Sequence, residues 1–141
     1  MDAFLTAILG VALYLAPTVS AHAQAGCPAP EPQAEARVTN FLSLPHLSEL
    51  RKVTDLGSSS ASDVHALAGE RDRETCAALR RAVAASGRRS DAGDRVAFYR
   101  SGDRYFVPIT PRRPTDRIRI GEHSVIEVYD TEYRLVARFS A

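Results

Sequence analysis

The sequence predicts an α+β fold, with N-terminal helices and one central helix packed on one face of an antiparallel β-meander of four to five strands. Apolar residues in the first two thirds of the chain recur at helical spacing, whereas those in the last third alternate with polar residues, as in strands. The helical patterns come first and the strand patterns later, and this segregated order favours the α+β class. The chain has 141 residues, of which 45% are hydrophobic and 25% charged, which suits one such domain.

The first 23 residues predict a secretory signal peptide, residues 1–23. Residues 3–16 form a continuous apolar run that is shorter than the roughly 20 residues of a membrane span and typical of a signal-peptide core. Ala21 and Ala23 supply the small-x-small cleavage pattern, so we expect cleavage after Ala23. The protein would then be exported to the periplasm or the extracellular medium, with no transmembrane span in the mature chain.

Three alternatives to a signal cleaved after Ala23 stay open at this point. No Lys or Arg precedes the apolar run, so the segment could instead be an uncleaved anchor or a buried helix. Gln24-Ala25-Gly26-Cys27 ends in the order small, small, Cys, which also suits a lipoprotein anchored at Cys27.

The mature chain begins with a Pro-rich flexible lead-in over 24–35, and a single domain occupies 36–141. Apolar spacing predicts a helix over 36–44, which Pro45 ends because proline cannot continue a hydrogen-bonded helix. A second helical pattern covers 47–56 and stops before a glycine.

A short strand over 63–67 and a central helix over about 73–86 come next. Asp72 is a favourable N-cap residue for this helix, because its side chain can accept a hydrogen bond from a free backbone N–H. Cys76 and Leu79 lie on one face of the helix and are expected to be buried.

Residues 95–100 and 104–109 predict a hairpin around the turn at 101–103. Pro108 is expected at a sheet edge or a strand end, because proline has no N–H to donate.

Three further strands complete the predicted meander. A brief strand covers 117–120 and a longer one covers 124–129. Residues 133–139 show the clearest alternation, which predicts one apolar, buried face and an opposite face with two arginines in water.

The segment from Asp63 to Ala85, followed by VAFYRSGDRYFVPI and SVIEVYDTEYRLVARFSA, resembles a family of small exported bacterial proteins of unknown role. The resemblance covers roughly residues 50–141 and rests on structural motifs. It implies a short strand, a capped helix with an early cysteine, a strand pair with a Gly turn and a terminal hairpin. It implies no catalytic residues.

Cys27 and Cys76 are the only cysteines, and export would place them in an oxidising compartment, where a disulfide is the expected state. A structural free thiol and a nucleophilic Cys76 remain alternatives, the latter because a helix N-terminus lowers the pKa of a thiol.

Motifs that carry chemistry are missing from the sequence. It contains no Gly-rich phosphate loop, no Walker pattern and no Gly-x-Ser-x-Gly elbow. His46, His65 and His123 have no metal-ligand spacing, and the scattered acids suit turns. We therefore expect no catalytic residues, no metal and no cofactor, with an acid–His pair as the enzymatic alternative to Cys76.

Arginines and tyrosines gather around the predicted hairpins and predict a binding surface for an envelope protein or an anionic polysaccharide. A net charge of +1 argues against nucleic acid as a partner. The alternative is a solvated strand face balanced by nearby acids. The surface comprises Tyr99, Arg100, Arg104, Tyr105, Arg112 and Arg113.

Taken together, these features predict a small exported, non-enzymatic binding or structural module of the cell envelope. An enzyme that uses Cys76 or an acid–His pair is one alternative. A carrier of a small apolar ligand, with a cavity between helix and sheet, is the other.

Overall fold

The computed structural model describes residues 26–86, 94–111 and 124–140. The described residues form three α-helices and one six-stranded antiparallel sheet in the order β1-β3-β4-β5-β6, with β2 also paired to β4. The α+β class and the meander are thus confirmed. Residues 1–23, the brief strand predicted over 117–120 and part of the predicted binding surface lie outside the described residues. The elements are α2 (Pro32–Leu42), α3 (Leu47–Val53), η2 (Ala61–Asp63), β1 (Val64–Ala66), η3 (Glu70–Asp72), α4 (Arg73–Ala85), β2 (Arg95–Val96), β3 (Tyr99–Ser101), β4 (Arg104–Thr110), β5 (Val125–Tyr129) and β6 (Leu135–Ser140).

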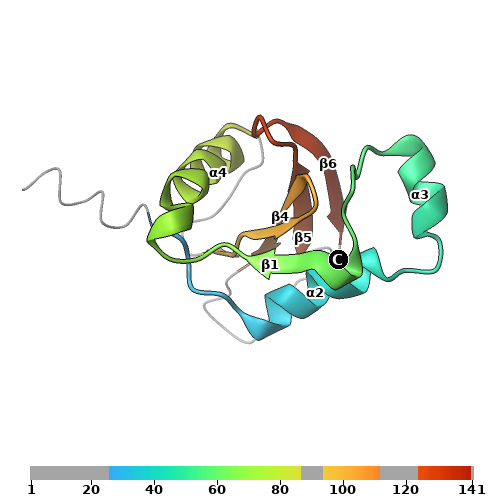
Figure 1. Ribbon diagram of the computed structural model, residues 1–141, viewed down its shortest axis with the longest axis horizontal. Coiled ribbons are helices and arrows are strands. Elements are labelled where there is room, and N and C mark those ends of the chain that lie inside the picture. The colour runs from blue at the N-terminus through green and yellow to red at the C-terminus, as the bar shows by residue number, and fades with distance from the viewer. Residues whose placement is uncertain (1–25, 87–93, 112–123, 141) are drawn as a thin grey trace, which may run out of the picture.

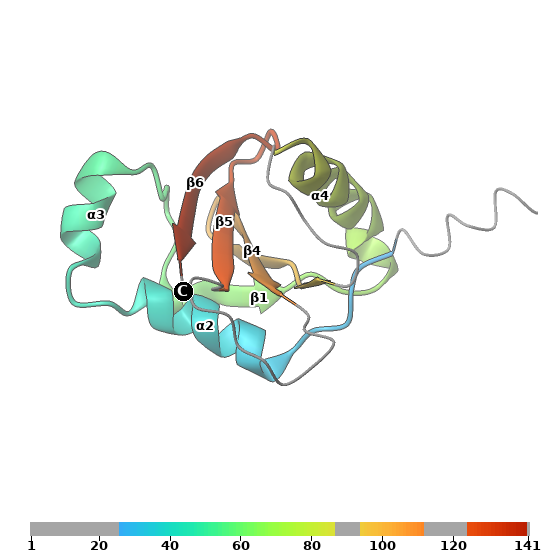
Figure 2. The same cartoon turned by 180° about the vertical axis from the view of Figure 1, so that it is seen from behind.

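The helices cover both faces of the sheet, whereas the sequence predicted helices on one face. Figures 1 and 2 place α2 and α4 on opposite sides of the strands. In the central strand β4, Phe106 packs in the cluster beneath α2, while its neighbours Tyr105 and Val107 pack in the cluster beneath α4. A strand buried on both faces is apolar throughout, so its sequence does not show how many faces are covered.

Helix α2 begins at Pro32, earlier than the predicted residue 36, and so includes the end of the expected lead-in. Proline is favoured in the first turn of a helix, where its missing N–H would have no helical partner. Ala34, Val38 and Phe41 repeat at helical spacing and pack against Phe106 and other apolar residues of the sheet. These contacts join the N-terminal third of the chain to the strands.

Helix α4 begins at Arg73, as predicted, and Asp72 occupies its N-cap position. The Asp72 side chain makes no capping bond, because its Oδ2 accepts a hydrogen bond from the N–H of Ala68 at 3.0 Å. The preceding 3₁₀ turn, η3, leads the chain into the helix instead. Helix α3 ends at Val53 and is therefore shorter than the predicted 47–56.

Pro108 lies in the middle of β4, opposite Ile126 of β5, so its predicted place at an edge or strand end is wrong. On its other side β4 pairs first with β3 and then with β2, and residues 97 and 98 between them belong to neither strand. The carbonyl of Pro108 accepts a long 3.4 Å bond from the N–H of Ala97. Because the N–H and C=O of a residue in an antiparallel strand point to the same neighbour, the missing N–H faces this interruption.

Strand β6 is only half buried, whereas the sequence predicted a buried apolar face. Leu135 is 37% exposed, although Phe139 packs on the aromatic ring of Phe41 with ring centroids 4.7 Å apart. The strand is at the end of the sheet, and a register shift at Val128/Tyr129 interrupts its pairing with β5. An edge position and a bulge both leave side chains partly in solvent.

Two tight turns, each with a left-handed glycine, interlock at one end of the sheet. Gly57 has φ +56° and Gly102, in the β3–β4 turn, has φ +58°. The carboxylate of Asp103 accepts hydrogen bonds from the N–H and the hydroxyl of Ser58. A Cβ atom on Gly102 would lie 2.4 Å from Oγ of Ser58, so only glycine fits this contact.

A buried carboxylate links β5 and β6, and its partner reaches the end of α4. Glu127 is 0% exposed. Its Oε1 accepts a hydrogen bond from the Tyr129 hydroxyl at 2.7 Å, and its Oε2 accepts one from Nε of Arg138 at 2.9 Å. Arg138 also donates to the carbonyl of Ser86, at the end of α4. The sequence predicted two arginines in water on one face of β6. One of them, Arg138, is instead bonded within the protein.

Candidate functional site

The two tyrosines of the predicted binding surface point to opposite faces of the sheet. The two-residue β3–β4 loop pairs Arg100 with Tyr105, and it pairs Tyr99 with Phe106. The Tyr99 hydroxyl bonds both the N–H and the carbonyl of Glu31, and its side chain is fully buried. Tyr105 is 7% exposed and stacks on Tyr133 with ring centroids 5.6 Å apart. Burial raises the pKa of both tyrosine hydroxyls.

Arg104, another residue of that surface, is buried and bonded within the protein. It is 8% exposed, and its guanidinium pairs with the carboxylate of Asp55 at 2.6 Å. It also donates to the backbone carbonyls of Asp55 and Asp103. Arg112 and Arg113 lie outside the described residues, so Arg100 is the one described member of the predicted surface that is exposed.

Cys27 and Cys76 form a disulfide with their Cα atoms 5.2 Å apart. Neither cysteine is free, so the alternatives of a structural free thiol and of a nucleophilic Cys76 are wrong for this structure. The bond indicates an oxidising, extracytoplasmic environment. Among the helices in the described ranges, none has the length and apolarity needed to cross a membrane.

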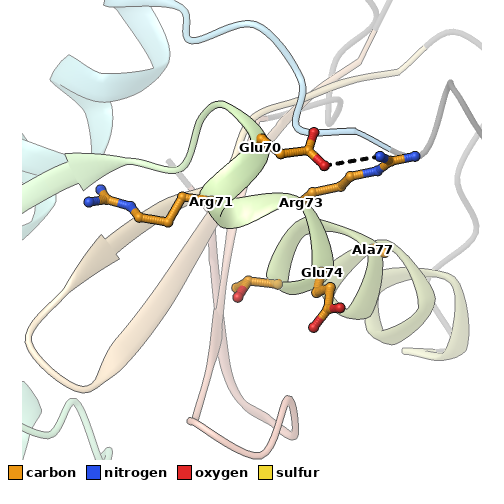
Figure 3. Close-up of a pocket in the computed structure, with 6 residues that line it drawn as sticks. Glu70, Arg71, Arg73, Glu74 and Ala77 are labelled. Carbon is orange, nitrogen blue, oxygen red and sulfur yellow. Dashed lines mark hydrogen bonds and ion pairs between the residues drawn. The ribbon is translucent and has the colours of Figure 1, made fainter.

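A hollow beside the first turn of α4 has the polar lining of an ordinary helix surface. In Figure 3, Arg71 and Arg73 extend in opposite directions, while Glu70 points toward Arg73. Arg73 forms an ion pair with Glu70 at 3.2 Å, and because both side chains are exposed, this pair adds little to stability or recognition. A surface ion pair of this kind does not by itself define a binding site.

A second groove, of about 570 Å³, gathers two arginines and a histidine between β1, η3 and β3. Arg100 enters it from β3, His65 from the edge strand β1, and Arg71 from η3. Figure 3 shows Arg71 reaching away from α4 toward the β1 side. We call this site the cationic groove; its lining residues are Asp63, His65, Ala66, Leu67, Arg71, Asp72, Arg100 and Gly102.

The two acids of the cationic groove are already engaged in local hydrogen bonds. Asp63 accepts from the N–H of Gly102 at 3.0 Å and pairs with Nε2 of His65 at 2.8 Å. The bond from Gly102 and then the bond from His65 lower the pKa of the Asp63 carboxyl. Asp72 accepts from the backbone of Ala68. Both carboxylates therefore hold the walls of the groove together.

The arginines of the groove keep donors for a ligand. Nε of Arg100 donates to the carbonyl of Gly102 at 3.1 Å, and its guanidinium lies over the ring of Tyr105, 5.8 Å from the centroid. These contacts fix the plane of the guanidinium, while its two terminal nitrogens have no hydrogen-bond partner within the described parts of the chain. The Arg71 side chain is 93% exposed and approaches Asp72 no closer than 4.0 Å. The arrangement is suited to anion binding.

Sequence reasoning treated His65 as isolated and did not single out Arg71. The strand predicted over 63–67 could have indicated the pairing of His65 with Asp63. Residues two apart in an extended chain share a side, and Asp63 and His65 are two apart, although Asp63 itself ends η2. This is the acid–His pair of the enzymatic alternative. In the described residues, however, no hydroxyl or thiol bonds to His65, and no cluster of three or more metal-ligating side chains forms.

Comparisons with protein-family models, with curated proteins and with solved structures found no match to this chain. Functional inference therefore depends on the geometry of the site.

Proposed function

We propose that the protein is an exported, non-enzymatic binding module of the cell envelope that binds an anionic polysaccharide in the cationic groove. The disulfide and the signal-like N-terminus support export. A polysaccharide is the favoured partner because the groove is open and polar, as suits a chain that passes over a surface, and because its arginines come from two separate elements, η3 and β3.

The observation that carries this proposal is that the acids of the groove are bonded within the protein, whereas its arginines keep donors that have no partner in the described residues. The carboxylates of Asp63 and Asp72 are held by backbone N–H groups, whereas Arg71 and Arg100 retain donors that face solvent. Carboxylate groups on a sugar chain would complete those donors with charge-assisted hydrogen bonds. Because the site is exposed, we expect the affinity to be modest and to fall with salt.

The test is a titration of the oxidised protein with oligogalacturonate as the carboxylated probe, with the neutral oligosaccharide maltohexaose for comparison. We expect binding of oligogalacturonate only, weakened about tenfold or more in the double variant Arg71→Gln/Arg100→Gln. Arg81→Gln is the matched control, because Arg81 is an exposed arginine on α4 that does not line the groove.

Three results would overturn the proposal. They are no binding of oligogalacturonate at low salt, equal binding of maltohexaose, and equal weakening by Arg81→Gln. The last result would mean that net charge alone attracts the probe.

A further inference from the structure

A second site lies at the far end of β4 from the β3–β4 turn, where Arg37 of α2 separates two hollows. The polar hollow, of about 330 Å³, is lined by Arg37 together with Glu31, Arg95, Thr110 and other polar residues. The second hollow, which we call the apolar hollow, has a similar volume of about 330 Å³ and is lined by Arg37, Asn40, Phe41, Leu44 and Ser140. Since Arg37 lines both, the two hollows are adjacent along α2. Figures 1 and 2 both show the end of β6 beside this helix.

The guanidinium of Arg37 is held in place but is not fully hydrogen-bonded. Its Nη2 donates to Oγ1 of Thr110 at 2.6 Å. Its Nε is buried and has no partner in the part of the chain that the structure describes. Buried donors are nearly always satisfied in native proteins, so each exception calls for an explanation. A bound acceptor would provide one here.

The charges around Arg37 also favour an anion. Arg95 lines the same polar hollow and pairs with Glu31 at 3.3 Å, so the one acid among the described lining residues is already engaged. The described lining holds two guanidiniums and one carboxylate, which is an excess of positive charge. Burial lowers the pKa of Arg37, the field of Glu31 raises it, and the field of Arg95 lowers it to a smaller extent. An added anion would offset the cost of burying this charge.

The apolar hollow begins directly beside this charge. Phe41 lies one helical turn after Arg37, and Leu44, just past the end of α2, is 40% exposed. The exposed leucine and the edge of the largely buried phenylalanine offer contact area to an apolar group. The two hollows thus present a cationic end and an apolar end along one side of the helix.

We propose that this site binds a small carboxylate with an apolar body, of the medium-chain fatty acid type. Its carboxylate accepts hydrogen bonds from Arg37, beside the hydroxyl of Thr110, and its aliphatic chain lies over Phe41 and Leu44. The site shares no residue with the cationic groove, so polysaccharide binding can fail without affecting this inference.

The experiment is a calorimetric titration of the oxidised protein with octanoate, octanol and acetate. Octanoate should bind at least about tenfold more tightly than octanol, which lacks the charge, and than acetate, which lacks the chain. Arg37→Gln should abolish the preference for octanoate over octanol. Arg71→Gln, in the cationic groove, should leave octanoate binding unchanged.

A second variant keeps the test decisive if Arg37→Gln fails to fold. Leu44 is partly exposed, so Leu44→Ser should preserve the fold while it weakens octanoate several-fold and leaves acetate unaffected. Equal affinity for octanoate and octanol, octanoate binding unchanged by Leu44→Ser, or no binding of octanoate would each overturn the proposal.

Discussion

The interlocked turns make Gly102 a position where a single methyl group is costly. Gly102→Ala adds left-handed strain to a Cβ that would meet both the side chain and the backbone of Ser58, so we expect a loss of about 4 kcal/mol. Gly69→Ala gives a comparison without a steric contact, because Gly69 has φ +78° and ψ −177°, a region that only glycine favours, but open space around it. It should lose about 2 kcal/mol from strain alone. Urea unfolding measures both, and equal losses would show that the contact with Ser58 carries no energy.

Tyr129 links stability to alkaline pH. Burial and the adjacent Glu127 carboxylate raise the pKa of its hydroxyl, so the folded chain keeps this proton at a pH where the unfolded chain has released it. The stability is therefore present below the ordinary tyrosine pKa of about 10 and is lost as the pH rises above it.

Tyr129→Phe tests this linkage. At neutral pH the variant should be less stable by about 1–3 kcal/mol, because the buried Oε1 of Glu127 loses its donor. The difference from the parent protein should narrow above a pH of about 10, since phenylalanine does not titrate. Urea midpoints measured over this range give the result. A constant difference would show that Tyr129 is not the linked group.

At the scale of single residues, the sequence showed which residue types are present but not which face of the sheet each one occupies. The two-residue loop at Gly102 sets the register that sends Tyr99 and Tyr105 to opposite sides. Applying that register to the sequence would have divided the predicted surface correctly. The burial of Arg104 could not be foreseen, because its partner Asp55 comes from a distant loop.

Arg138 adds side-chain bonds to the backbone pairing that holds β6 on the sheet. Arg138→Glu would place a second carboxylate against the buried Glu127 and remove the bond to the carbonyl of Ser86. We expect a loss of about 3 kcal/mol in urea unfolding.

The control for β6 is Arg134→Glu, in the exposed turn before the strand. Arg134 pairs with Asp130 and Glu132 while its side chain stays 68% exposed, so the loss should be below about 1 kcal/mol. If the two variants lose equal stability, the buried position of Glu127 does not determine the strength of its pairing with Arg138.

The order and type of the elements were predictable, because helical spacing and alternation are local signals. Their ends were less so. Nothing in the sequence indicates that β2 and β3 are separated at residues 97 and 98, and this interruption allows Pro108 to lie in a central strand. Likewise Pro32, the first residue of α2, was predicted to belong to the lead-in, because proline occurs both in linkers and in the first turn of helices.

At the scale of the whole molecule, the disulfide joins two residues that are 49 positions apart in the sequence. It ties the segment before α2 to the buried face of α4, where Cys76 is 0% exposed. Replacing both cysteines by alanine should lower the free energy of unfolding by up to about 4 kcal/mol, chiefly because the unfolded chain gains freedom. Reduction of the parent protein should have a similar effect on its urea midpoint. Unchanged stability in both experiments would contradict this account.

Export itself is tested by the intact mass of the protein recovered from its own host. Cleavage after Ala23 gives a chain that begins at Gln24, and the disulfide makes it two hydrogens lighter and resistant to alkylation before reduction. A lipid-sized increase at Cys27 would instead indicate a lipoprotein. Uptake of label at Cys76 would return the thiol-based enzyme to consideration.

The single bridge also determines how the chain can mature. Two cysteines admit one intramolecular pairing, so a wrong disulfide within the chain cannot form and no reshuffling step is needed. A thiol oxidant is sufficient, and an isomerase should not accelerate the recovery of native protein from the reduced, unfolded state. Cys76 follows Cys27 by 49 residues, so during export the bridge can close only after Cys76 has crossed the membrane. Oxidation is therefore a late step in the folding of the N-terminal half.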